Sequence, residues 1–261
     1  EPESVRASVQ GAARALARAY KGCGGGVAMA IEGLLLSSID ASASSAGGGA
    51  ENSRRLVAAQ WARELFPFDH VPARYLCVVA AGDAKADVRE EGRAGLRPPG
   101  EEELLAKRRA GRFASEKTEK TEPEDEKSSR ALPSATSVLA YLRARHPELG
   151  KPAALTARLP LPPLAMAAAL AFAKRCVAEE TAANPGTAAP EGYRLFLEHC
   201  LVKAAPPELT GAATEALLEL VEQFPETFAE PADAAAAVAR VRHFAAHVDA
   251  PTRRVAAKLC G

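Results

Sequence analysis

Apolar residues recur every three to four positions along most of the chain, the spacing that places them on one side of an α-helix. In residues 4–20, for example, Val5, Val9 and Leu16 fall on a common side. Convincing period-two alternation, which is typical of half-buried strands, is absent from the sequence. The stretch VPARYLCVVAA could form a buried strand, but its length and the acid before it favour a helix. The pattern therefore predicts an all-α protein.

Proline, glycine and capping residues set the expected helix ends. Asn52 or Ser53 is suited to cap one helix and Asp69 the next, with Pro72 in a first turn, where a missing N–H costs little. The NPG tripeptide at 184–186 predicts a turn. The predicted helices are residues 4–20, 27–39, 53–65, about 70–82, 87–96, 134–145, 161–180, 190–203, 207–224, 231–248 and 251–260.

A short link around Asp83 joins two of these helices, so they are expected to pack antiparallel. Asp87 is placed to cap the second helix, with Glu90 reaching back to form a capping box. We expect Val88 to face the core and Arg89 to reach a neighbouring acid, such as Asp83 or its equivalent in the next hairpin. The two glycines of the GRAG stretch that follows are poor helix formers, and close packing between helices would explain them.

Three segments share a pattern: residues 2–16, 83–96 and 247–261. Each has an acidic or proline-containing link, then Val-Arg or Thr-Arg, then small residues three to four apart, then a leucine. This pattern resembles the second helix of a HEAT repeat, which implies that the linking acid lies near an arginine of a neighbouring unit. Such hairpins bury their apolar faces by stacking. We therefore expect an α-solenoid of HEAT-like antiparallel helical hairpins.

The composition changes between residues 98 and 133. Residues 115–130, SEKTEKTEPEDEKSSR, are almost wholly charged or polar, so they bury too little apolar surface to offset the entropy of ordering. We expect a disordered insert there, either a solvated loop or a docking or modification segment. The predicted organisation is HEAT-like repeats over 1–97, the insert over 98–133, and repeats again over 134–261, in one continuous solenoid. The helical character of both ends leads us to expect a fragment of a longer protein.

Charge and hydropathy narrow the function classes. The chain has 33 basic and 33 acidic residues, without the basic excess typical of a nucleic-acid-binding protein. No run of about 18 apolar residues predicts a membrane span, and the first residues lack the layout of a signal peptide. The five cysteines are far apart and include no CxxC pair, so we expect buried thiols in a reducing compartment rather than a zinc site.

Motifs that could carry chemistry have weak support. The GCGGG stretch follows a helix rather than a strand, which argues against a nucleotide-binding loop. His199 and Cys200 are neighbours on a helix and point in different directions, so they do not form a catalytic pair by themselves. His243 and His247 have zinc-compatible spacing but no evident third ligand. We predict no catalytic residue, no cofactor and no metal, and keep as an alternative a helical enzyme that uses Cys200 or the two histidines.

The block at residues 66–96, FPFDHVPARYLCVVAAGDAKADVREEGRAGL, is more specific than a generic HEAT hairpin. It resembles the large proteasome adaptor and scaffold family of the "extracellular mutant twenty-nine" type, in its plant or algal form. Three later segments occur in the same order as in that family: LPLPP at 159–163, the helix at 207–226 and the final 247–261 segment. The resemblance covers about two thirds of the chain and omits the inserts.

The resemblance implies a non-catalytic scaffold or adaptor, located in the cytoplasm and nucleus and linked to protein quality control. Such a protein would bind regulatory and core particles of the 26S proteasome and stabilise or monitor their association. The alternative is a HEAT-repeat protein-binding module of another class, such as a transport receptor or a phosphatase scaffold. The family has no catalytic residues to carry over, and we interpret the repeat-motif residues as architectural: Val5, Arg6, Arg74, Tyr75, Asp83, Asp87, Val88, Arg89, Asp249 and Arg253.

Overall fold

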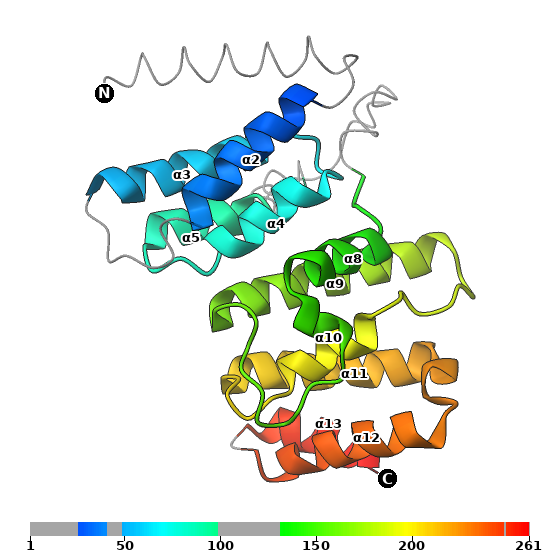
Figure 1. Ribbon diagram of the computed structural model, residues 1–261. Coiled ribbons are helices and arrows are strands. Elements are labelled where there is room, and N and C mark those ends of the chain that lie inside the picture. The colour runs from blue at the N-terminus through cyan, green and yellow to red at the C-terminus, as the bar shows by residue number, and fades with distance from the viewer. Residues whose placement is uncertain (1–25, 41–48, 99–130, 248, 261) are drawn as a thin grey trace, which may run out of the picture. The chain divides into compact units, whose positions relative to one another are not determined.

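A computed structural model describes residues 26–40, 49–98, 131–247 and 249–260 (Figure 1). Within these ranges the chain forms α-helices and short 3₁₀-helices and no strand, which confirms the all-α prediction. The predicted helix over 4–20 and the charged segment over 115–130 lie outside the described residues. The chain divides into two compact units, residues 1–133 (unit 1) and residues 134–261 (unit 2).

In unit 1, α4 (Val71–Ala80) packs against the other three described helices, and so does α3 (Gly49–Glu64). The contact face of α3 is made of small residues, since Ala58, Ala59 and Ala62 are at most 2% exposed. Small side chains let the neighbouring helices approach closely, and Ala59 forms one buried cluster with Ala80 and Val88. The helices are α2 (Gly26–Asp40), α3 (Gly49–Glu64), α4 (Val71–Ala80) and α5 (Ala86–Ala94).

In unit 2 the helices pack mainly against near neighbours in the sequence (Figure 1). Helix α9 contacts α8, α10 and α11, and α11 in turn contacts α10 and α13. The apolar core runs along the inner sides of α9, α10 and α11. The elements are α8 (Ala135–Arg145), η2 (Pro147–Gly150), α9 (Pro163–Ala183), α10 (Tyr193–Cys200), α11 (Pro207–Gln223), η3 (Pro225–Phe228), α12 (Pro231–Arg242), η4 (His243–Ala246) and α13 (Ala250–Cys260).

Three predicted caps of unit 1 are wrong. Helix α3 begins at Gly49, upstream of Asn52 and Ser53. Helix α4 is capped by His70 rather than by Asp69, because the His70 imidazole accepts the Ala73 N–H at 3.3 Å. Helix α5 begins one residue before Asp87 and has no side-chain cap. The capping box cannot form there, because the spacing from the real N-cap no longer places Glu90 at the third helical position.

The helix ends of unit 2 differ from the predicted ones by a few residues. Helix α10 begins later than predicted because Gly192 has a positive φ of 83°, which ends the preceding turn just before the helix. Gly186, in the predicted NPG turn, also has a positive φ, of 89°. The segment predicted as one helix over 231–248 is α12 followed by the 3₁₀-helix η4.

Candidate functional site

The link between α4 and α5 holds an ion pair that joins it to α3. Arg55 Nε lies 2.6 Å from Asp83 Oδ2, and both side chains are about nine-tenths buried. Asn52 Oδ1 accepts a second bond from Arg55 at 2.6 Å. Asp83 Oδ1 also accepts the backbone N–H of Lys85 at 2.8 Å, which closes the turn. The linking acid therefore binds an arginine of α3 rather than one of the two helices that it joins.

Arg89 was expected to reach a neighbouring acid, but its guanidinium binds backbone carbonyls instead. Its Nη1 donates to the backbone carbonyls of Asp83 and Ala84, at 2.8 Å and 2.6 Å. It thus reaches the link, but the Asp83 carboxylate is already held by Arg55. Two carbonyls of the turn are satisfied by one guanidinium, so Arg89 fixes the angle at which the chain enters α5.

The link before α13 repeats this arrangement. In both links the arginine donates to the carbonyl six residues earlier, from Arg89 to Asp83 and from Arg253 to His247, the latter at 2.7 Å. The residue before each arginine is buried: Val88 is 2% exposed and Thr252 is 3% exposed. Helices α5 and α13 also begin at the same distance before this arginine, at Ala86 and at Ala250. The shared sequence pattern therefore corresponds to a shared local structure.

Asp249 lies immediately before α13 and caps it. Its Oδ2 accepts the backbone N–H of Thr252 at 2.9 Å and the Thr252 hydroxyl at 2.8 Å. These bonds favour the carboxylate and lower the pKa of Asp249, the backbone bond most strongly. The corresponding position before α5 is Lys85, which caps nothing. The two links therefore share the arginine contact and differ in the cap.

Arg74 is the largest fully buried side chain of the described residues, at 2% exposure. Its Nη2 donates to Ala62 O at 2.6 Å, near the end of α3, and its Nη1 donates to Gly95 O, at the end of α5. The guanidinium thus meets the negative ends of two helix dipoles. It also lies 5.0 Å from the centre of the Phe68 ring. Burial lowers the pKa of Arg74, and the nearby Cys77 opposes that shift.

The remaining predicted motif residues are scattered among different environments. Tyr75 is buried beside Arg74 in α4, and Asp87 is exposed in the first turn of α5. Val5 and Arg6 lie outside the described residues. The structure brings Asp83 and Arg89 to one link and Asp249 and Arg253 to another, and the architectural role of the set stays a prediction.

Unit 2 contains a buried charge network that the sequence pattern did not indicate. Glu198 of α10, 6% exposed, accepts Arg194 Nη1 at 2.9 Å, Arg240 Nη2 at 3.3 Å and the Ala153 N–H at 3.3 Å. Arg240 Nη2 donates to Ala153 O at 2.6 Å, and Arg194 Nη2 lies 3.0 Å from Asp233. The network ties α10, α12 and the segment after η2 together. Nothing in the sequence around Glu198 or Arg240 distinguishes these two residues from charged residues on the surface.

The described thiols are poor nucleophiles. Cys77, Cys176 and Cys200 are free and buried, as predicted for them. Burial raises the pKa of Cys77 and Cys200 and raises that of Cys176 to about 12. His199 beside Cys200 hydrogen-bonds through Nε2 to Lys151 O at 3.1 Å rather than to a thiol. A thiol that stays protonated, without a base, does not support nucleophilic chemistry.

The histidine pair of unit 2 has a structural role. His247 Nδ1 accepts the Asp249 N–H at 3.1 Å, so its proton lies on Nε2, which donates to the Thr210 hydroxyl at 3.1 Å. His243 contacts the edge of Phe244. Among the described residues, no group of three His, Cys, Asp or Glu side chains is arranged to hold a metal ion.

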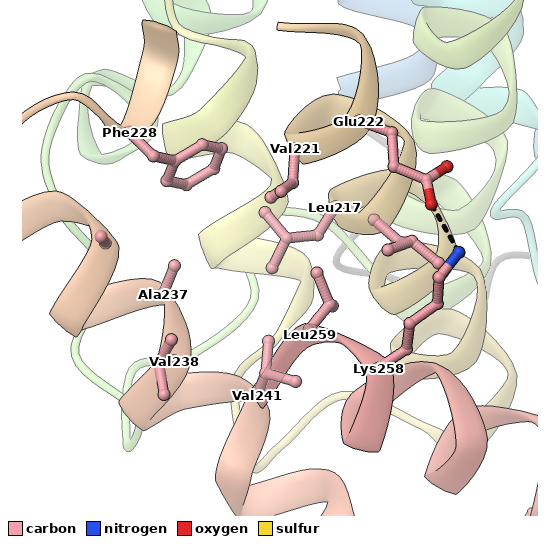
Figure 2. Close-up of a pocket in the computed structure, with 11 residues that line it drawn as sticks. Leu217, Val221, Glu222, Phe228, Ala237, Val238, Val241, Lys258 and Leu259 are labelled. Carbon is pink, nitrogen blue, oxygen red and sulfur yellow. Dashed lines mark hydrogen bonds and ion pairs between the residues drawn. The ribbon is translucent and has the colours of Figure 1, made fainter. Parts of the chain in front are cut away.

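An apolar groove of about 300 Å³ lies between α11, α12 and α13. Figure 2 shows Leu217, Val221, Val241 and Leu259 converging on it. A salt bridge of 2.5 Å between Glu222 and Lys258 borders one side. Val238 of α12 is 41% exposed at the groove. Such a surface can accept an aliphatic or aromatic side chain.

Filling this groove should stabilise unit 2. Ala237 lines the groove from α12, so Ala237→Leu places three more carbons against the apolar wall while changing helix propensity little. We expect a gain of about 0.5–1 kcal/mol in the free energy of unfolding. Ala236→Leu, an exposed position on the same helix outside the groove, is the matched control. Equal effects of the two variants on helical circular dichroism melts would mean that the groove is not filled.

Residues 1–80 match the family "Proteasome component ECM29, N-terminal". This stretch is similar to the N-terminal part of that family. The match includes α2, α3 and α4 and confirms the family resemblance for this part of the chain. No curated protein and no solved structure matched in the corresponding comparisons. No described helix is both long and apolar enough to cross a membrane.

Proposed function

We propose that this chain is a non-catalytic scaffold segment of the ECM29 type that binds the 26S proteasome. In this role it stabilises or monitors the association of the regulatory and core particles. The observation that carries the proposal is the match of residues 1–80 to the ECM29 N-terminal family. The proteasome link comes from that family, and the regulatory and core particles are the expected partners.

The proposal includes a HEAT-like solenoid architecture. Two observations support it: within each unit the helices pack mainly on helices one or two places away along the chain, and the α5 and α13 links share one arginine-to-carbonyl contact. A stack of such hairpins presents an extended surface suited to binding a large partner. We further propose a cytoplasmic and nuclear location, to be checked by fractionation alongside proteasome subunits.

The proposal is tested by capture of the tagged chain from a cell extract. We expect regulatory-particle and core-particle subunits to be enriched, and excess untagged chain to reduce that enrichment. Enrichment of transport cargo or phosphatase subunits instead would favour a HEAT-repeat module of another class. Recovery of no proteasome subunit would reject the proposed partner.

A further inference from the structure

His70 occupies the start of α4 and contacts three different groups. Its Nδ1 accepts the backbone N–H of Ala73 at 3.3 Å, which caps the helix. Its ring stacks on Phe66 with centroids 4.5 Å apart. Its Nε2 faces Glu32 Oε2 of α2 at 3.8 Å. One imidazole thus joins the N-terminus of α4 to a neighbouring helix.

The cap requires the neutral form of the ring. Nδ1 accepts a hydrogen bond, so it carries a lone pair and the ring proton lies on Nε2, toward Glu32. A proton added at Nδ1 would face the Ala73 N–H and the positive end of the α4 dipole. The first turn of α4 would then lose the hydrogen bond that the His70 side chain accepts from the Ala73 N–H.

We propose that His70 is a proton-sensitive joint of unit 1, and that its protonation releases the start of α4 from its cap. The nearby charges act in both directions. Arg74, one turn further along α4, repels an imidazolium, whereas Asp69 and Glu32 attract it. Nε2 carries a hydrogen toward Glu32 in both protonation states, so protonation changes only the Nδ1 side of the ring. The loss of the cap therefore distinguishes the protonated ring from the neutral one.

The direction of the pH dependence follows from the surroundings of the ring. Burial, and then the charge of Arg74, lower the pKa of His70 below its ordinary value of 6.5. A lowered folded-state pKa means that the unfolded chain takes up the proton first as the pH falls. The stability contributed by the cap is therefore present above about pH 6.5 and is lost as the pH falls through the lower folded-state pKa.

The test is amide hydrogen exchange of the full chain at pH 7.5 and pH 5.0, expressed as protection factors for the first turn of α4. We expect protection there to fall several-fold at the lower pH in the wild-type chain. His70→Asn keeps an N-capping side chain that does not titrate, so its protection should change little. His243→Asn, an exposed histidine of unit 2, should behave as the wild type does. An equal loss of protection in His70→Asn and wild type would overturn the proposal.

A second measurement needs no substitution at all. Nitrogen chemical shifts of the histidine rings in the wild-type chain report the tautomer and the titration midpoint of His70. We expect an unprotonated Nδ1 at neutral pH and a midpoint below that of a free histidine. A proton on Nδ1 at neutral pH, or a midpoint at or above 6.5, would contradict the proposal even if the variants failed to fold.

Discussion

Glu198→Ala should destabilise unit 2 by about 3–5 kcal/mol, the usual cost of removing one partner of a buried ion pair. This carboxylate is 6% exposed and is the acid that faces both Arg194 and Arg240. Its removal leaves the Arg240 guanidinium, with a side chain only 10% exposed, without a counter-charge, and an uncompensated buried charge costs far more than a surface pair gains. The loss should appear as a lower melting temperature by circular dichroism and as faster hydrogen exchange in α10 and α12.

The chain provides a matched control for this substitution. Glu191 pairs with Arg143 at a similar distance of 2.9 Å, but its side chain is 77% exposed. Glu191→Ala should therefore change stability by less than about 1 kcal/mol. Replacing Glu198 and Arg240 together by methionine should cost less than Glu198→Ala alone, because no charge is left buried. Equal costs for Glu191→Ala and Glu198→Ala would show that the network contributes little.

Gly92→Ala should destabilise unit 1 by about 2–3 kcal/mol. A β-carbon at this position would lie 2.4 Å from Ala81 N and 2.7 Å from Cys77 O, both backbone atoms that cannot rotate away. Helix α5 must therefore shift away from α4. Trp61, the one tryptophan of the chain, lies in α3 of the same unit, so its fluorescence during urea unfolding measures the effect.

Gly33→Ala is the control for helix propensity. Gly33 lies within α2 of the same unit, and a β-carbon there would meet no atom within 4 Å. Because alanine forms helices better than glycine, this variant should gain about 0.5–1 kcal/mol. A stabilised Gly92→Ala would contradict the close approach of α5 to α4.

The periodic apolar pattern predicted most of the described helices, because each helix buries a stripe of residues spaced by the helical repeat. Their ends were less predictable. The sequence indicated Asp69 and Asp87 as caps, but the backbone turns one or two residues earlier or later than each of them. A good capping side chain acts only where the backbone leaves the helical conformation, and tertiary packing can move that point by one or two residues.

The links were partly predictable and the charge networks were not. The Val-Arg and Thr-Arg pattern indicated a common local structure, and Arg89 and Arg253 do make corresponding contacts. The partner of Asp83 proved to be Arg55, from a helix far away in the sequence. Glu198 and Arg240 likewise lie 42 residues apart, and only the folded chain brings them together. Spacing rules cover neighbours along a helix, whereas such pairs depend on tertiary packing.

Direct binding between purified components is the best test of the proposed binding of this chain to the proteasome. The folded state of the chain is checked first by circular dichroism and Trp61 fluorescence, and fluorescently labelled chain is then sedimented with purified 26S proteasome. Proteasome binding predicts saturable co-sedimentation that excess unlabelled chain abolishes. Folded chain that stays in the supernatant at every proteasome concentration, up to about 10 μM, would contradict it.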